Sequence, residues 1–162
     1  MRYRIGMDGG GTRTRIAVIA HGQERFRCET GGINYNSFSQ GEIADNLTRG
    51  LMILREQGYL PEDCESVGIG AAGISNPNAE PFLKQCVKAK GFSCSIVVAG
   101  DQEAALLGGI GQAPGILLIA GTGSICIAQD GEGNHFRTGG YGHIIDDAGS
   151  AYAAGRDILT AS

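Results

Sequence analysis

Short apolar runs separated by turn residues open the chain and predict a meander of strands. Residues 3–7 and 14–20 are two such runs on either side of a glycine-rich turn, and residues 23–30 follow the turn at His21-Gly22. Short runs of this length, bounded by turn residues, are typical of strands. We therefore expect three antiparallel strands at the start of the chain.

Helical and strand patterns alternate in the following segment. Ser39 begins a predicted helix, and Glu42, three residues later, completes a capping box. Asn78 is expected to cap a second helix that runs to about residue 90. Strands are predicted over 66–71 and 95–99, and a short helix over 102–107. A meander followed by crossover helices predicts an α/β fold, with a mixed sheet and helices on its faces.

The pattern restarts after residues 112–115, which contain Pro114. Strands are predicted at 116–120, 125–129 and 135–138, and a last helix over about 149–159. The second half therefore opens like the first, as a weak internal repeat. We expect a lobe over residues 1–113 and the incomplete beginning of a second lobe over 114–162, because about 50 residues bury too little surface for a core of their own.

Composition and charge narrow the class of protein. The 162 residues carry a net charge of −4 without a basic stripe, which argues against nucleic acid as a partner. No apolar run reaches the length of a membrane span, and the N-terminus lacks the apolar region of a signal peptide. The five cysteines form no C-x-x-C pair, as is typical of reduced thiols. We expect a cytoplasmic protein with no membrane partner.

The first glycine-rich turn, Asp8-Gly9-Gly10-Gly11-Thr12-Arg13-Thr14, is a candidate phosphate site. Glycine lets a backbone approach a ligand closely, and successive free N–H groups can bind an anion. The turn is neither a Walker A loop nor a dinucleotide fingerprint, because a strand follows it. Asp8, at the end of a buried strand, can hold hydrated magnesium. An ordinary hairpin stays open as an alternative, and Thr14 suits either a phosphate contact or a strand.

A second turn, Gly121-Thr122-Gly123-Ser124, occurs at the equivalent point of the second half. A tight turn alone would explain it. Because the turn recurs at this point, we favour two glycine-rich turns that bind the same phosphate chain. Two aspartates, Asp146 and Asp147, precede the last helix and can be caps or ligands.

Asp101 follows the strand at 95–99 and starts a helix, so its ordinary role would be an N-cap. Asp8, Gly73 and Asp101 all follow strands that we expect to run in the same direction. They would then share the edge of the sheet where ligands of open α/β folds gather. A carboxylate near phosphate at that edge suits a general base for an attacking hydroxyl.

These segments in this order resemble the N-terminal part of the BadF/BadG/BcrA/BcrD ATPase family, specifically its N-acetylglucosamine and glucosamine kinases. The matching segments are 8–14, 32–36, 70–73, 100–101, 120–124 and 139–152. The family is part of the acetate/sugar kinase, heat-shock ATPase and actin superfamily. The resemblance implies an RNase H-like (actin-like ATPase) lobe with a mixed sheet and the start of a second similar lobe, with nucleotide and sugar between them.

The resemblance also implies ATP and Mg²⁺ as cofactors and phosphorylation of an amino sugar, glucosamine or N-acetylglucosamine, by transfer of the γ-phosphoryl group to a sugar hydroxyl. Asp101 would accept the proton of that hydroxyl, and Asp8 would hold Mg²⁺ through water. The implied ATP contacts are Asp8, Gly9, Gly10, Gly11, Thr12, Thr14, Gly121, Thr122, Gly123 and Ser124. The implied sugar contacts are Asn34, Asn36, Gly73, Thr122 and Asp147.

The sequence departs from the family pattern at two places, and these departures leave the identity of the sugar open. Residues 146–150 read Asp-Asp-Ala-Gly-Ser where many relatives have Gly-Asp-Glu-Gly-Ser, and Tyr141 replaces a usual Trp. The extra carboxylate at Asp146 favours a free, cationic amine. Relatives continue well past residue 162, so we expect the 162-residue chain alone to be inactive. The hydroxyl that is phosphorylated and the assembly state, a homodimer included, stay open.

Two alternatives remain at this point. One is the activator ATPase of a 2-hydroxyacyl-CoA dehydratase, which would hold an iron–sulfur cluster with cysteines between subunits. The other is a non-catalytic, sugar-sensing module.

Overall fold

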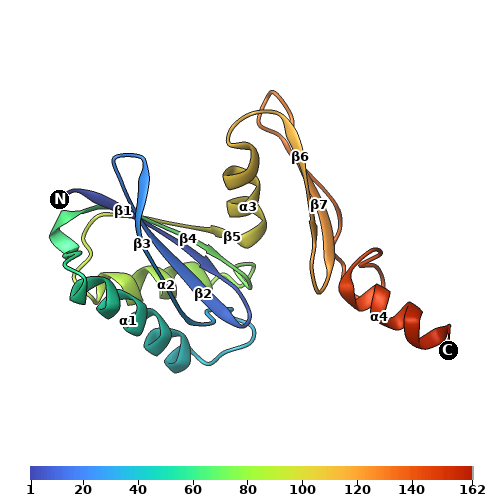
Figure 1. Ribbon diagram of the computed structural model, residues 1–162, viewed down its shortest axis with the longest axis horizontal. Coiled ribbons are helices and arrows are strands. Elements are labelled where there is room, and N and C mark those ends of the chain that lie inside the picture. The colour runs from blue at the N-terminus through green and yellow to red at the C-terminus, as the bar shows by residue number, and fades with distance from the viewer. Residues whose placement is uncertain (162) are drawn as a thin grey trace. The chain divides into compact units, whose positions relative to one another are not determined.

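A five-stranded mixed sheet forms the centre of the first unit, Met1–Ala104, in the computed structural model, which describes residues 1–161 (Figure 1). Its strand order is β3-β2-β1-β4-β5. The antiparallel meander consists of β1 (Tyr3–Gly9), β2 (Arg13–Ala20) and β3 (Gln23–Gly31). Next to β1 lie β4 (Cys64–Ala71) and β5 (Ser95–Gly100), both parallel to it. The carboxyl ends of β1, β4 and β5 therefore share one edge of the sheet, as predicted.

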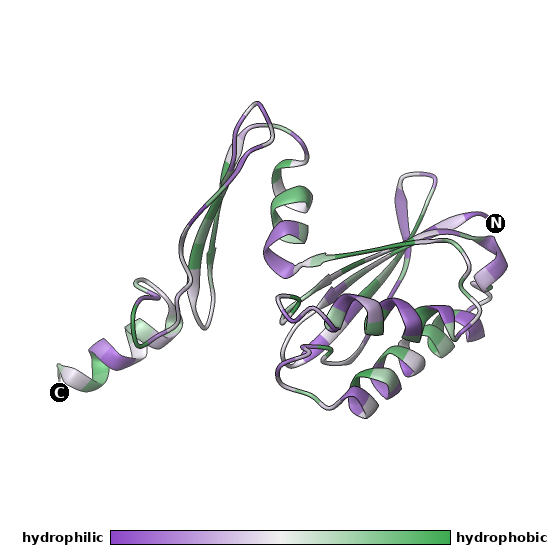
Figure 2. Cartoon of the chain, turned by 180° about the vertical axis from the view of Figure 1, so that it is seen from behind, coloured by the Kyte–Doolittle hydropathy of each residue, from purple (hydrophilic) through white to green (hydrophobic). Residues whose placement is uncertain are grey.

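Two helices, α1 (Gln40–Glu56) and α2 (Ala79–Lys88), cover one face of this sheet (Figures 1 and 2). A 3₁₀ turn, η1 (Pro61–Asp63), precedes β4. Alternate residues of the strands face the helices, so apolar side chains from both layers form one core. Among its fully buried side chains are Ile16, Val18, Ile43, Leu47, Leu54, Val67, Ile69, Leu83 and Val87.

The two helices begin differently. The predicted capping box is confirmed at α1, where the Glu42 N–H donates to Ser39 Oγ at 3.3 Å and the Ser39 N–H donates to Glu42 Oε2 at 2.9 Å. The predicted cap at α2 is wrong, because the Asn78 side chain makes no capping hydrogen bond. The side chain of Asn76 instead accepts the Asn78 N–H at 3.0 Å. An asparagine turn thus stabilises the segment before α2.

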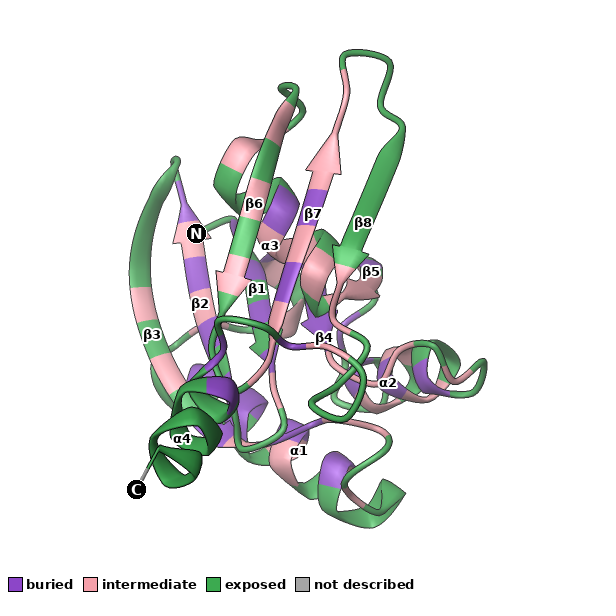
Figure 3. Cartoon of the chain, turned by 90° about the vertical axis from the view of Figure 1, so that its right-hand side faces the viewer, coloured by how far each residue is buried: buried purple, intermediate pink, exposed green. Residues whose placement is uncertain are grey.

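The second unit begins at Ala105, inside α3 (Asp101–Ile110). Its three-stranded antiparallel sheet contains β6 (Gly115–Ala120), β7 (Ser124–Gln129) and β8 (His135–Gly139), followed by α4 (Ala151–Thr160). A small core joins Ile125 and Ile127 of β7 to Leu106 of α3. Figure 3 shows β8 exposed along most of its length.

The internal repeat and the α/β class are confirmed, since each unit contains a three-stranded antiparallel meander with a glycine turn between two of its strands. The division into lobes 1–113 and 114–162 stays a prediction. No helix in the described part of the chain has both the length and the apolar character needed to cross a membrane.

Candidate functional site

The carboxyl edge of the first sheet brings Asp8 and Asp101 to either side of Gly70. Asp8 pairs with Gly70 across the parallel strands β1 and β4. A Cβ atom on Gly70 would lie 4.0 Å from the Asp101 Cα and only 2.5 Å from the Ala104 Cβ. The first turn of α3 therefore packs directly on the bare backbone of Gly70, and only glycine admits it there. This packing holds Asp101 beside Gly70, near the carboxyl end of β4.

The first glycine turn is anchored by three backbone hydrogen bonds. The Gly10 N–H donates to the Arg13 carbonyl at 3.0 Å, Ala72 donates to the Gly9 carbonyl at 3.0 Å, and Ile33 donates to the Gly10 carbonyl at 3.3 Å. The amide groups of Gly11 and Thr12 have no acceptor within residues 1–161. Both residues are exposed. Free, neighbouring N–H groups in a fixed turn are an anion-binding arrangement.

The loop that carries Asn34 and Asn36 packs between this turn and Gly73. The Asn34 Oδ1 accepts the Asn36 N–H at 2.9 Å, which closes an asparagine turn. Gly73 has φ +79°, and a Cβ there would lie 2.5 Å from Asn34 Oδ1 and 3.1 Å from the Asn36 nitrogen. Asn34, Asn36 and Gly73, which the resemblance implied as sugar contacts, are thus brought together at the same edge.

Thr14 requires a correction. Its side chain is fully buried, and its hydroxyl donates to the Gly31 carbonyl at 2.9 Å. Thr14 therefore joins β2 to the end of β3 inside the core. This structural role leaves the Thr14 hydroxyl unavailable for the expected phosphate contact, whereas Thr12 is exposed.

Asp8 lies at the penultimate position of β1 with its side chain 70% exposed, and its Oδ2 is 3.7 Å from a guanidinium nitrogen of Arg15. Among the described residues no three side chains form a cluster that could hold a metal by themselves. Mg²⁺ commonly binds through one carboxylate, retained water and substrate phosphates. A single exposed carboxylate beside a candidate phosphate turn fits that mode of binding.

Asp101 is the first residue of α3, and its carboxylate is exposed. Its Oδ1 accepts the N–H of Gln102 at 2.9 Å. The other oxygen, Oδ2, has no protein partner within the described residues. The helix contact orients the carboxylate and leaves one oxygen available to accept a proton.

The second glycine turn, between β6 and β7, is held by the segment that leads into α4. The carbonyls of Gly121 and Thr122 accept the N–H groups of Ala151 at 2.8 Å and Tyr152 at 3.3 Å.

The Ser124 hydroxyl donates to the Ala148 carbonyl at 2.8 Å, and the Ser124 N–H donates to Asp147 Oδ1 at 3.1 Å. Both donors of Ser124 are thus used within the second unit. The N–H groups of Thr122 and Gly123 have no acceptor in the described part of the chain.

Each unit therefore assembles its own part of the predicted set. The first unit groups the turn at 8–12, Asn34, Asn36, Gly73 and Asp101, and the second unit groups the turn at 121–124 with Asp147. Sequence reasoning missed Arg15 beside Asp8. The hairpin register that pairs Asp8 with Arg15 could have indicated it. It also missed the bond between Asp147 and Ser124, for which no local signal exists.

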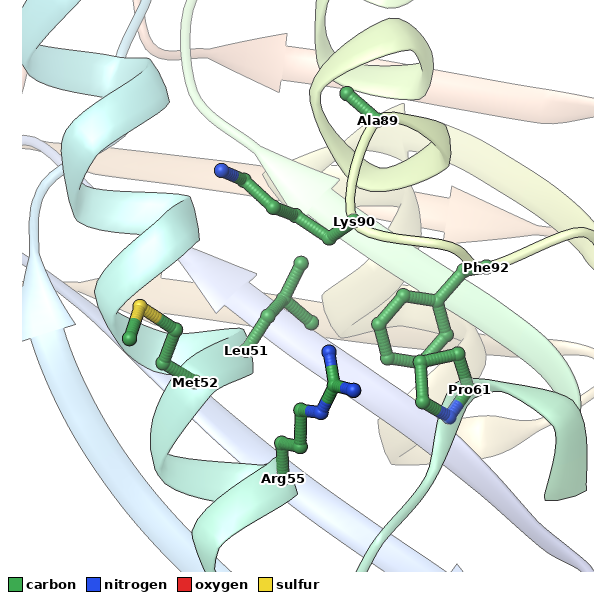
Figure 4. Close-up of a pocket in the computed structure, with 7 residues that line it drawn as sticks. All are labelled: Leu51, Met52, Arg55, Pro61, Ala89, Lys90 and Phe92. Atoms are coloured by element: carbon green, nitrogen blue, oxygen red, sulfur yellow. The ribbon is translucent and has the colours of Figure 1, made fainter.

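The pocket shown in Figure 4 lies at the opposite edge of the first sheet. Its volume is about 250 Å³, and it is lined by Leu51, Met52, Arg55, Pro61, Ala89, Lys90 and Phe92. Pro61 and Phe92 precede the amino ends of β4 and β5. Arg55 lies in the last turn of α1, where a helix dipole favours a cation. This pocket is therefore separate from the candidate site.

The model of the BadF/BadG/BcrA/BcrD ATPase family matches residues 5–162. The chain belongs to this family. The predicted RNase H-like fold is confirmed by the crystal structure of a putative N-acetylglucosamine kinase from Chromobacterium violaceum, which superposes with a TM-score of 0.80 at 30% identity and covers 99% of this chain and 56% of that one.

Relatives of this chain carry names that describe an activity. The N-acetylmuramic acid/N-acetylglucosamine kinase of Clostridium acetobutylicum is 35% identical over 164 residues, covering 100% of this chain and 54% of that protein. The glucosamine kinase GspK of Vibrio cholerae is 32% identical over 161 residues, covering 98% of this chain and 54% of that protein. The chain spans about half the length of these relatives.

Proposed function

We propose that the complete protein phosphorylates an amino sugar at the expense of ATP. The observation that carries this proposal is the carboxyl edge of the first sheet. There Asp101 and Asp8 flank Gly70, beside the free amides of Gly11 and Thr12. The names of the relatives, two kinases of amino sugars, support the same reaction class.

The proposed phosphate contacts follow from the N–H groups that the two turns leave free, and the proposed sugar contacts follow from the resemblance to amino-sugar kinases. Gly11 and Thr12 in the first turn, and Thr122 and Gly123 in the second, donate N–H groups to phosphate oxygens. Asn34, Asn36, Gly73, Thr122 and Asp147 contact the sugar. Asp8 holds Mg²⁺ through water, and the metal, when bound, offsets charge on the phosphates.

Asp101 is the proposed general base. Its free Oδ2 accepts the proton of the sugar hydroxyl as that oxygen bonds to the γ-phosphorus, and the bond between the γ-phosphorus and the leaving oxygen breaks to release ADP. The hydrogen bond from the Gln102 N–H to Oδ1 fixes the carboxylate during this transfer. The proton, the phosphoryl group and the leaving group are then all accounted for.

The experiment that tests the function is a coupled assay of ADP release by the complete protein with glucosamine, N-acetylglucosamine and, as a matched control without the amine, glucose. We expect release that depends on the amino sugar, with kcat/KM for glucose at least about tenfold lower. Preference for glucosamine would agree with the extra carboxylate at Asp146. ADP release that is equal with and without sugar would contradict the proposal and favour the activator ATPase.

Removal of the metal tests the second part of the proposal. Chelation by EDTA is expected to abolish ADP release, and added Mg²⁺ is expected to restore it, because the phosphate charge would otherwise be unscreened. Full turnover in EDTA would contradict a magnesium role for Asp8.

A further inference from the structure

We propose that Asp147 is a positioning residue that holds the second glycine turn in the conformation that binds nucleotide phosphate. This inference rests on the proposed function and deepens it. The sugar contact proposed for Asp147 would use one carboxylate oxygen. The other oxygen, Oδ1, already accepts the Ser124 N–H at 3.1 Å.

The surroundings of Asp147 show that this contact is built into the unit. Asp147 is only 8% exposed and has φ +66°, a left-handed conformation that is uncommon outside glycine, although asparagine and aspartate adopt it more readily than other residues. Its own carbonyl accepts the Ser150 N–H at 3.1 Å. A backbone in this conformation persists only where the surrounding contacts require it. Here the left-handed conformation accompanies the contact of the carboxylate with the turn.

Gly123 is the reason that the carboxylate can come so close. A Cβ on Gly123 would lie 2.9 Å from Asp147 Oδ2 and 3.1 Å from Oδ1, both shorter than normal contacts. No positive φ requires glycine at this position. The glycine is therefore explained by the carboxylate that crosses it, in addition to any close approach of phosphate.

The contacts also determine which amides face a ligand. The carbonyls of Gly121 and Thr122 are turned toward the first N–H groups of α4, and the Ser124 N–H is turned toward Asp147. The N–H groups of Thr122 and Gly123 remain without a protein acceptor in the described chain. Loss of the Asp147 carboxylate would free the Ser124 N–H and loosen one side of this turn. Nucleotide would then have to order the turn on binding, which weakens its affinity.

Two substitutions separate the side chain from the backbone. Asp147→Gly removes the acceptor and accommodates φ +66° without strain. Asp147→Asn is the matched control, because asparagine tolerates the same φ and its amide oxygen can accept the same N–H. Gly123→Ala is the second probe, since its Cβ would push the carboxylate away while Asp147 itself is retained.

The first measurement is hydrogen exchange over residues 121–125 in the nucleotide-free complete protein. The second is binding of the non-hydrolysable ATP analogue AMP-PNP with Mg²⁺, without sugar, by calorimetry. We expect Asp147→Gly and Gly123→Ala to exchange faster and to bind AMP-PNP at least about tenfold more weakly, and Asp147→Asn to stay within about threefold of the unaltered protein. The double variant should be no weaker than Asp147→Gly alone, because both changes break one contact.

Unchanged affinity in Asp147→Gly would overturn the proposal and leave Asp147 as a sugar ligand only. Tighter binding of AMP-PNP by Asp147→Gly would overturn the proposal as well, because it would mean that the carboxylate blocks the phosphate site. Failure of the proposed function is distinguishable from both results. It would appear as AMP-PNP binding without sugar-dependent ADP release, or as no AMP-PNP binding by the unaltered protein, whatever the exchange of the variants.

Discussion

Three positions of the candidate site require glycine because a neighbouring group lies too close to the backbone for a side chain to fit. At Gly70 the neighbour is the first turn of α3, at Gly73 it is the asparagine loop, and at Gly123 it is the Asp147 carboxylate. In each case an added Cβ would lie 2.5 to 2.9 Å from its neighbour. Substitution at these positions therefore tests specific contacts rather than general flexibility.

Gly73→Ala is expected to raise the KM for the amino sugar by at least about tenfold, because the new Cβ would displace Asn34 and the loop that it orders. The matched control is Gly58→Ala. Gly58 has a similar positive φ, +85° against +79°, but nothing lies within 4 Å of its Cβ position. Both variants should lose about 1 kcal/mol of stability from backbone strain. Equal sugar KM values in the two variants would contradict a sugar contact at Gly73.

Thr14→Val is expected to lower the free energy of unfolding by about 1 to 2 kcal/mol, because the Gly31 carbonyl loses its buried donor while the side chain keeps its shape. Urea unfolding measures this change, and Thr14→Ser, which keeps the hydroxyl, is the control. The affinity for AMP-PNP should stay the same in both variants. A large loss of nucleotide affinity in the valine variant alone would restore the phosphate role predicted for Thr14.

The candidate site was predictable from sequence where local pattern was sufficient. Asp8, Gly73 and Asp101 share an edge because each follows a strand of the same direction, which the order of strands and helices indicated. Thr14 was ambiguous because it lies in a glycine turn motif and also alternates with Ile16 and Val18 on the buried face of β2. Its partner, the Gly31 carbonyl, is 17 residues away and leaves no local signal.

At the scale of elements, side-chain packing determines where the helix that begins at Asp101 ends, and local propensity did not predict that end. The helix at Asp101 was expected to stop at residue 107, before Gly108 and Gly109. It continues to Ile110 because Leu106 and Ile110 pack on the second sheet. Such tertiary contacts outweigh the low helix propensity of glycine.

Packing at the amino end of the first sheet also shifts the pKa values of two buried side chains, Tyr3 and Cys64. Burial raises the pKa of the Tyr3 phenol above its ordinary value, and burial, with the neighbouring Cys94, raises the pKa of the Cys64 thiol to about 12. The Tyr3 hydroxyl donates to the Leu60 carbonyl at 2.8 Å, which requires its proton. The folded chain thus favours the protonated forms of both groups.

Stability should therefore fall as the pH rises. The unfolded chain releases these protons first, from about pH 8.5 for the thiol and about pH 10 for the phenol, so folding free energy is lost from those values upward until the folded-state pKa values are passed. We expect Tyr3→Phe to lose about 1 kcal/mol at pH 7 and to show a shallower decline in urea midpoint between about pH 10 and 11.5. Tyr141→Phe, which changes an exposed tyrosine, is the control. An identical decline in Tyr3→Phe and the unaltered chain would contradict this account.

At the scale of the whole molecule, the chain spans about half the length of the relatives that it matches. On the second sheet Ile116 and Leu118, alternate residues of β6, are 72% and 68% exposed. Two large apolar side chains on one face of a strand leave that face without a core. The first unit, by contrast, has a continuous core between its sheet and two helices.

We therefore expect the 162-residue chain by itself to show no sugar-dependent ADP release above background, although its first unit should unfold cooperatively in urea. A protein of the relatives' length is the control in the same coupled assay. Turnover of the 162-residue chain at a comparable kcat would contradict this expectation and would show that the described units contain all the groups required for catalysis.

The most direct test of the account is the single-turnover rate of phosphoryl transfer by Asp101→Asn in the complete protein, with Glu103→Gln as the matched control. Glu103 is an exposed carboxylate in the same first turn of α3. If Asp101 is the base at the carboxyl edge of the first sheet, its variant should lose at least about 100-fold in rate while amino-sugar binding stays within about threefold, and the control should be unchanged. A rate within threefold of the unaltered protein for Asp101→Asn would contradict the central claim.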